Sequence, residues 1–452
     1  MAKLWSKGYE LDPLIERYQS ARNAALDAEL VRHDLWGSCA QARMLHKIGL
    51  LDDAEWAAID DALRRLLREA RAGALRPSTA EEDIHTTIEN RLVAMVGEAG
   101  KKIHTGRSRN DQVLLDLRLY AKESILAIAG SLLDTASSLL ALARRYEWTP
   151  MPGYTHMQRA MLSSVGLWAA AYAEALLDDC VALAAAYTLN DQSPLGSAAA
   201  YGVPLPLDRA YVAELLGFAH THHNVLTAAN SRGKGEAAVV QALALVMLDL
   251  SKWAQDVLLF TTREYDFLRV PQELCSGSSI MPQKRNLDTL ELVRARAQTV
   301  IALQGQMLAT LAGLPSGYNM DFQETKAPFI EAVHLCKESL EIVGLFAAHI
   351  DVDAARLQAA CTAELFATDR ALDLARQGTP FRDAYVAVAT TADAPEQTDI
   401  AARLRARSHE GAPGNLDLAG VAARISTEQA AWDARRAHFQ QAIAALVGEN
   451  AG

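Results

Sequence analysis

Residues 123–148 read ESILAIAGSLLDTASSLLALARRYEW, and this stretch decides the fold class. Its apolar side chains recur at intervals of three, four and seven residues, the spacing of one helix face: Ile125, Ile128, Leu132, Leu139 and Leu142. Alanine and leucine, which are strong helix formers, fill many of the other positions. The stretch therefore predicts a long helix with an apolar face.

The same periodicity occurs on both sides of this stretch. It predicts long helices near 112–147, 161–190, 236–264, 287–312 and 326–350. Helices in globular proteins average about 11 or 12 residues, so helices of this length indicate a bundle. No segment alternates like a strand for long, and we expect an all-α fold. More than one helix face is apolar, which predicts association with partner subunits.

Breaks in the helical pattern divide the chain into three expected domains. We expect an N-terminal helical domain over 1–105, a central long-helix bundle over 106–354 and a small C-terminal helical domain over 355–452. In the last range, the loop sequences DAPEQTD (393–399) and EGAPGNLD (410–417) separate what read as shorter helical patches.

The composition excludes several classes of protein. The chain has 452 residues and a net charge of -11, which disfavours nucleic-acid binding through its overall field, so an anionic ligand must be met locally. Five cysteines without metal-type spacing indicate neither a disulfide framework nor a metal site. The start, MAKLWSKGYELD, lacks a signal-peptide core, and no long apolar run predicts a membrane span. We expect a cytoplasmic protein.

One stretch, GSSIMPQKRN (277–286), combines conformational freedom with polar side chains. Gly277 and the paired serines favour backbone freedom, and Pro282 blocks helix continuation. Apolar residues at helical spacing return after Asn286. The stretch is therefore predicted to be a loop that leads into a helix.

Three further stretches carry polar groups at predicted helix ends or turns. HTGRSRNDQ (104–112) offers two arginines, two hydroxyls and an asparagine before a helix, which suits an anion site; the alternative is a solvated cap by Ser108 or Asn110. EEDIHTTIE (81–89) places Asp83 and His85 in a first helical turn, where each can be merely a cap or a dipole partner. GYTHMQR (153–159) puts Thr155 and His156 after a Pro-Gly turn, where a lone histidine is more often structural.

Metal and nucleophilic catalysis find no support in the sequence. The histidines of HTHHN (220–224) lack helical metal-ligand spacing and a nearby carboxylate pair, so a surface loop is the default. Neither a nucleophile elbow nor a phosphate-binding loop of the P-loop type occurs. If the protein is an enzyme, acid–base chemistry without metal or cofactor remains.

The order and separation of four stretches, HTGRSRNDQ, GYTHMQRA, GSSIMPQKRN and YNMDFQETK (318–326), resemble the argininosuccinate lyase family of the aspartase/fumarase superfamily. The resemblance extends over most of the chain, from KLW near the start to ATDRALDLARQGTPFRDAY (367–385). It implies a three-domain lyase whose long helices assemble into the helical core of a homotetramer, with each active site built from three subunits.

The resemblance also implies the reaction. Family members split argininosuccinate into arginine and fumarate by removing a carbon-bound proton, through an aci-carboxylate intermediate and without cofactor or metal. By the family's pattern Ser278 looks like the general base and Lys284 stabilises the intermediate, while the loop closes over substrate. His156 looks like the residue on the acid side, with Glu291 orienting its imidazole.

Further residues match the family's substrate-contacting positions. The resemblance implies binding roles for Ser38, Ser108, Arg109, Asn110, Thr155, Asn286, Tyr318, Gln323 and Lys326. Asp83, His85 and Arg232 are additional candidates.

Some positions depart from the family's usual pattern. The usual S-[DE]-R-D is replaced by NSRGKGE (230–236) around Arg232, the proline after the loop asparagine is Leu287, and QEDK becomes QETK. Two alternatives therefore stay open: a related lyase that releases another amine from an N-substituted aspartate, and a catalytically silent scaffold like the crystallins.

Overall fold

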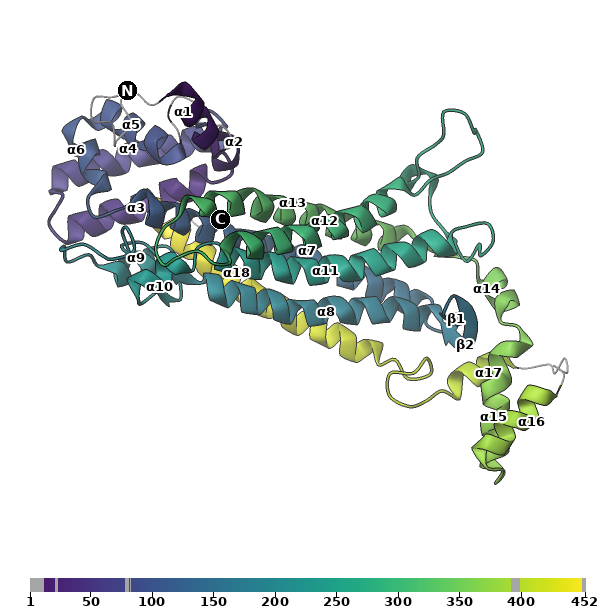
Figure 1. Cartoon of the computed structure of the whole chain (residues 1–452). Helices are drawn as coiled ribbons and strands as arrows, with labels where there is room; N and C mark the ends of the chain where they lie inside the picture. Colours follow the sequence, from purple (N-terminus) through teal and green to yellow (C-terminus); the bar gives the residue numbers. More distant parts are fainter. Residues whose placement is uncertain (1–11, 21–22, 78–80, 82, 392–398, 449–452) are drawn as a thin grey trace.

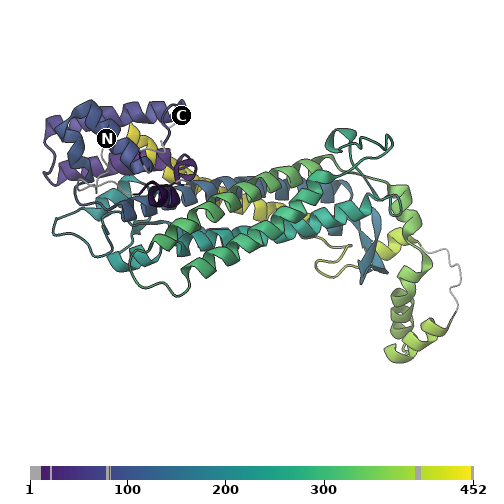
Figure 2. The ribbon, with the colours of Figure 1, turned by 45° about the horizontal axis from the view of Figure 1, so that its top comes forward.

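The computed structural model describes residues 12–20, 23–77, 81, 83–391 and 399–448. The chain forms an elongated helical body, as Figures 1 and 2 show from two directions. A group of helices from the N-terminal part lies at one end, long helices run through the middle, and short helices lie at the other end. The all-α prediction is confirmed.

Five long helices make the bundle: α7 (Arg109–Arg145), α8 (Val165–Asn190), α11 (Lys234–Phe260), α12 (Asp288–Leu311) and α13 (Lys326–His349). They confirm the helices predicted from periodicity. The 37 residues of α7 give it a length of about 55 Å, enough to connect both ends of the body. The apolar residues that marked it in the sequence, among them Ile125 and Leu132, are fully buried.

Two bundle helices, α7 and α11, are long and apolar enough to cross a membrane by length and composition. In each, 61% of the apolar window is buried against neighbouring parts of the chain. This burial is typical of core helices, so their composition is explained by the bundle.

The N-terminal end is built on α3 (Val31–Lys47), α4 (Asp53–Arg71) and α5 (Ile84–Val96). The start of α4 is fixed by a capping box, in which Asp52 Oδ1 accepts from the Glu55 amide at 2.8 Å and Glu55 Oε2 accepts from the Asp52 amide at 3.2 Å. Helix α3 packs on α7 and joins this end to the bundle. The smaller elements here are α1 (Pro13–Ser20), α2 (Asn23–Asp27), α6 (Glu98–Lys101) and η2 (Lys102–His104).

A β-hairpin interrupts the helices where the sequence predicted helix from about residue 161. Strand β1 (Pro150–Thr155) pairs antiparallel with β2 (Gln158–Ser164), so α8 begins only at Val165. The two-residue turn has left-handed backbone at His156 (φ 52°) and Met157 (φ 61°), as a tight hairpin turn requires. The predicted helix start was therefore wrong by about one turn, because residues 158–164 pair with a strand.

Short elements connect the bundle helices. Two further pairs of short strands are β3 (Gln192–Ser193) with β4 (His220–Thr221) and β5 (Leu268–Arg269) with β6 (Asp351–Val352). The remaining connections hold α9 (Arg209–Leu215), α10 (Val225–Asn230), η3 (Gln272–Leu274) and η4 (Met320–Thr325).

The C-terminal part has two components. Short elements at the end of the body remote from α3 are α14 (Ala354–Ala360), η5 (Ala363–Phe366), α15 (Ala367–Arg376), α16 (Phe381–Thr390) and α17 (Ile400–Arg405). Helix α18 (Leu418–Val447) then runs back along the bundle and packs on α7 and α8. The expectation of only shorter helical patches after 355 was wrong for this 30-residue helix. The domain boundaries themselves stay a prediction.

Candidate active site

The start of α7 carries the first group of predicted site residues. Ser108 is the N-cap: its Oγ accepts from the Asn110 amide at 3.2 Å, and Asp111 Oδ1 accepts from the Ser108 amide at 2.9 Å. The cap that was the alternative to an anion site is thus present. Arg109 forms an ion pair with Asp83, whose carboxylate also caps α5 by accepting from the Thr86 amide at 2.9 Å. Asp83 therefore ties α5 to α7.

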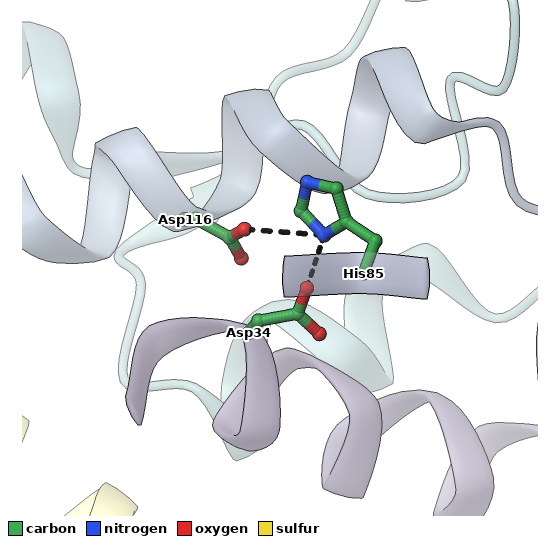
Figure 3. A group of neighbouring side chains, drawn as sticks. All are labelled: Asp34, His85 and Asp116. Carbon is green, nitrogen blue, oxygen red and sulfur yellow. Dashed lines mark hydrogen bonds and ion pairs between the residues drawn. The ribbon is translucent and has the colours of Figure 1, made fainter. Parts of the chain in front are cut away.

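A buried triad from three helices lies beside this segment (Figure 3). His85 Nδ1 on α5 is hydrogen-bonded to Asp34 on α3 and lies 3.7 Å from Asp116 Oδ2 on α7. Burial alone would raise the pKa of Asp34, but the His85 imidazole holds that pKa below its ordinary value. Burial and then the Asp34 charge raise the pKa of Asp116 well above its ordinary value. The pKa values of the two carboxyl groups are therefore shifted in opposite directions.

The ligand-capable atoms of Asp34, His85 and Asp116 lie within 4.8 Å of one another. This is the arrangement, within the described part of the chain, that comes nearest to a metal-ligand set. Burial alone would lower the pKa of His85, but the Asp34 carboxylate raises it above its ordinary value. His85 Nδ1, the ring nitrogen that faces both carboxylates, is hydrogen-bonded to Asp34. The sequence separates these residues widely, so spacing could not reveal the triad.

Ser38, a predicted substrate contact, is buried against the same triad. Its Oγ donates to Asp34 Oδ1 at 3.2 Å and accepts from Arg107 Nη1 at 3.2 Å. Arg107 was not among the predicted site residues, although it stands in the HTGRSRNDQ motif. Burial lowers the pKa of its guanidinium, against the opposing effect of Asp34.

The residues predicted to hold the leaving amine form a second group at the same end of the bundle. Arg232 Nη2 donates to Gln323 Oε1 at 3.4 Å, and Gln323 Nε2 donates to Tyr318 Oη at 3.2 Å. The Arg232 guanidinium also lies over the Tyr318 ring, 5.3 Å from its centroid. Lys326 Nζ lies 2.5 Å from Asp27 Oδ1, and both side chains are buried.

A small cavity joins the two groups, because its lining includes Asn110 from α7 together with Arg232 and Tyr318. Its wall also includes Ala198, whose amide donates to Asp111 Oδ2 at 2.7 Å. Ala198 has a left-handed backbone with φ 54°. Burial raises the pKa of Asp111 to about 6, against the opposing effect of its hydrogen bonds. The loop that contains Ala198 was not predicted to line the site, because no motif in the sequence marks it.

The departure NSRGKGE has a structural reason in this fold. Gly233 adopts φ 78° at the start of α11. A Cβ at Gly235 would collide with the buried guanidinium of Arg118, which donates to Asn190 Oδ1 at 2.7 Å and to Ser231 Oγ at 2.7 Å. Gly235 therefore makes room for a buried arginine that holds Ser231, next to Arg232, whereas a Cβ at Gly233 would collide with Leu311.

The predicted catalytic loop lies before α12, as expected. Ser276 and Asn286 exchange backbone hydrogen bonds of 2.9 Å, which close the loop at its base. Within it, Ser278 Oγ accepts from the amides of Met281 at 3.2 Å and Ile280 at 3.4 Å. Lys284 is exposed and lines a cavity between the loop and residues 261–270. Glu291 is exposed in the first turn of α12.

The remaining predicted residues, Thr155 and His156, are exposed at the turn of the β1–β2 hairpin. This hairpin lies at the end of the bundle that also carries the loop 277–286 (Figure 1). The start of α7 and the segment between α12 and α13, which carry the residues predicted to bind substrate, lie at the end that carries α3 and α5. Within one chain, therefore, the predicted binding residues lie at one end of the bundle, and the loop 277–286 and the hairpin lie at the opposite end.

Comparison with known proteins defines the family. A family model described as Lyase matches residues 10–302. The chain is 44% identical over 423 residues to an argininosuccinate lyase from Sorangium cellulosum, covering 94% of this chain and 98% of the relative. It is 40% identical over 387 residues to an argininosuccinate lyase from Thermotoga neapolitana, covering 86% of this chain and 97% of the relative.

Solved structures share the fold. An EDDS lyase in complex with formate matches with a TM-score of 0.82 at 22% identity, over 98% of this chain and 95% of that one. A class II fumarase from Schistosoma mansoni matches with a TM-score of 0.69 at 14% identity, over 80% and 88%. The family model and the sequence relatives show that the chain belongs to the argininosuccinate lyase family of carbon–nitrogen lyases.

Proposed function

We propose that the protein cleaves argininosuccinate reversibly into arginine and fumarate, as a step in making arginine. The observation that carries this assignment is 44% identity to an argininosuccinate lyase over 94% of the chain, with the loop serine, lysine and asparagine of the family's pattern all present. The reaction requires neither an oxidant nor a cofactor, because it moves one proton and breaks one carbon–nitrogen bond.

In this proposal Ser278 removes the carbon-bound proton. A serine hydroxyl is a weak base unless its oxyanion is stabilised. Its Oγ accepts from the amides of Ile280 and Met281, which are donors of the kind that stabilise an oxyanion. Charge then develops on the adjacent carboxylate as the aci-carboxylate forms, and Lys284 and Asn286 stabilise it there.

The proton donor for the departing nitrogen lies on the β1–β2 hairpin. His156 supplies a proton to the departing nitrogen, directly or through water, and Glu291 of another subunit orients the imidazole. Thr155, Ser108, Arg109 and Asn110 hold the substrate carboxylates, while Tyr318, Gln323 and Lys326 hold the arginine moiety. The guanidinium of the substrate is already protonated and can leave as a neutral guanidine, so the demand on His156 is modest.

We further propose a homotetramer with active sites shared between subunits. The separation of the two residue groups within one chain supports this assembly. Exposed apolar side chains on the bundle helices offer the surface: Val181, Leu245, Leu248, Leu292, Ile301, Leu308 and Leu345. We place the protein in the cytoplasm, consistent with five free cysteine thiols.

Fumarate release, followed by ultraviolet absorbance, tests the function. The purified protein is expected to form fumarate from argininosuccinate and, in reverse, to consume fumarate with arginine. Release from other N-substituted aspartates but not from argininosuccinate would instead assign a related lyase, a candidate favoured by the NSRGKGE departure beside Arg232. No release from any of them would leave a silent scaffold.

A further inference from the structure

One carboxylate, that of Asp34, holds both ends of the segment Arg107–Gln112. At the far end, Gln112 Nε2 donates to Asp34 Oδ1 and Oδ2, each at 3.1 Å. At the near end, Ser38 Oγ donates to Asp34 Oδ1 at 3.2 Å and accepts from Arg107 Nη1 at 3.2 Å. The segment between these anchors carries Ser108, Arg109 and Asn110, which are predicted to bind substrate carboxylate.

The position of Asp34 suits a fixed anchor. It lies on α3, is 1% exposed, and is itself held by His85 Nδ1 from α5. Its bonds to Ser38, Gln112 and His85 use both of its oxygens as acceptors, which suits the ionised form. Hydrogen bonds to a charged acceptor are stronger and more directional than bonds between neutral groups.

Asp116 provides an internal contrast. It is 0% exposed and lies in the same triad, yet neither of its carboxylate oxygens has a hydrogen-bond partner. Burial without a hydrogen bond favours the neutral form of Asp116, against the attraction of the His85 ring, whose Nδ1 lies 3.7 Å from Asp116 Oδ2. The two carboxyl groups of one triad therefore differ: Asp34 accepts hydrogen bonds from three side chains, whereas neither oxygen of Asp116 accepts one.

We propose that Asp34 is a positioning residue, which orients the segment Arg107–Gln112 for binding of the substrate's carboxylate through Ser38 and Gln112. Asp34 does not touch the substrate. This inference deepens the proposed function and rests on it, because the substrate is assigned there.

Two isosteric variants of the full-length protein test the proposal. Asp34→Asn keeps the shape and removes the charge, so KM for argininosuccinate is expected to rise about ten- to a hundredfold, with a smaller change in kcat. Asp116→Asn matches the neutral form of that residue, and its KM is expected to stay within about twofold of the parent. A purely structural role of the triad would make the two variants lose activity and melting temperature in parallel.

A double-mutant cycle shows whether Asp34 acts through Ser38. Ser38→Ala is expected to raise KM by itself, and adding it to Asp34→Asn is expected to cause little further loss. Effects that multiply, or an unchanged KM in a folded Asp34→Asn protein, would overturn the proposal. If Asp34→Asn does not fold, Ser38→Ala and Gln112→Leu decide instead, since each removes one anchor, and an unchanged KM in both would overturn it.

Failure of the proposed function can be separated from failure of this inference. Parent protein that releases no fumarate from argininosuccinate contradicts the function. Calorimetric binding of succinate, used as a dicarboxylate probe, still measures the segment without turnover. Asp34→Asn is expected to bind succinate about tenfold more weakly than the parent, and equal binding would overturn the role of Asp34.

Discussion

Asn110 and Ser278 lie at opposite ends of the bundle within one chain. Asn110 shares a small cavity with Tyr318, which follows the C-terminal end of α12, whereas Ser278 precedes the N-terminal end of that helix. The 24 residues of α12 place about 36 Å between its ends. An active site that uses both residues therefore needs at least two chains.

Mixed assemblies test this sharing. Ser278→Ala and Asn110→Ala are each expected to impair turnover, and mixing the two chains is expected to restore part of it, because some sites receive neither change. The matched control mixes Ser278→Ala with Lys284→Ala: both changes lie in one loop, so no site gains an intact loop. Equal behaviour of the two mixtures, with subunit exchange verified, would argue for sites within one chain.

Replacement of the proposed base separates chemistry from folding. Ser278→Ala is expected to abolish fumarate release, while the melting temperature stays within about 1–2 °C because a loop hydroxyl contributes little to the core. Ser279→Ala, which alters the neighbouring exposed hydroxyl, is the control and is expected to remain active. Substantial turnover by Ser278→Ala would remove this residue from the base role.

Lys326 is expected to matter for stability as well as binding. Lys326→Met leaves the buried Asp27 without its cation, although the Ile84 amide still donates to Asp27 Oδ2, so the free energy of unfolding in denaturant is expected to fall by about 3 kcal/mol. Gln323→Ala, from the same segment, is expected to raise KM with a much smaller stability loss, because Gln323 is only half-buried. Equal stability of Lys326→Met and the parent would show that the ion pair is not formed in solution.

Asp179 on α8 makes stability depend on pH. Burial, followed by the charges of Asp249 and Asp178, raises the pKa of Asp179 from 3.8 to about 7. Because the folded pKa exceeds the unfolded one, its stabilising contribution is complete below pH 3.8 and is lost as pH rises through about 7. Asp179→Asn is therefore expected to melt at a higher temperature than the parent at pH 8, with the difference shrinking toward pH 4.

An exposed acid on α7, Asp134, provides the comparison for that experiment. Asp134→Asn is expected to change the melting temperature only slightly, because this side chain is exposed on α7. A gain for Asp179→Asn that does not vary with pH would contradict the assigned ionisation.

The helices of the bundle were predictable from sequence because their periodicity is strong. Residues such as Ile125 and Leu132 are buried where a 3.6-residue repeat places them. Helix α18 was missed because polar runs such as STEQ (426–429) and DARR (433–436) interrupt its widely spaced core residues, among them Trp432 and Phe439. The β1–β2 hairpin was missed because its strands pair locally without regular alternation.

The candidate site was predictable only as separate motifs. The loop around Ser278 and the cap at Ser108 are local features, and both are where the sequence placed them. The triad of Asp34, His85 and Asp116 depends on three helices meeting, and the wall at Ala198 depends on a loop folding against α7. Contacts between distant segments leave no spacing to read in a single sequence.

The return of α18 along the bundle bears on how the nascent chain acquires its fold. This helix covers α7 and α8, and its end contacts Arg43 and Arg64 of the first-made helices through the carbonyls of Leu446 and Val447. A ribosome makes these partners long before residues 418–447 emerge. Until then the apolar side chains of α7 and α8 that α18 covers stay exposed, and a chaperone is suited to shield them.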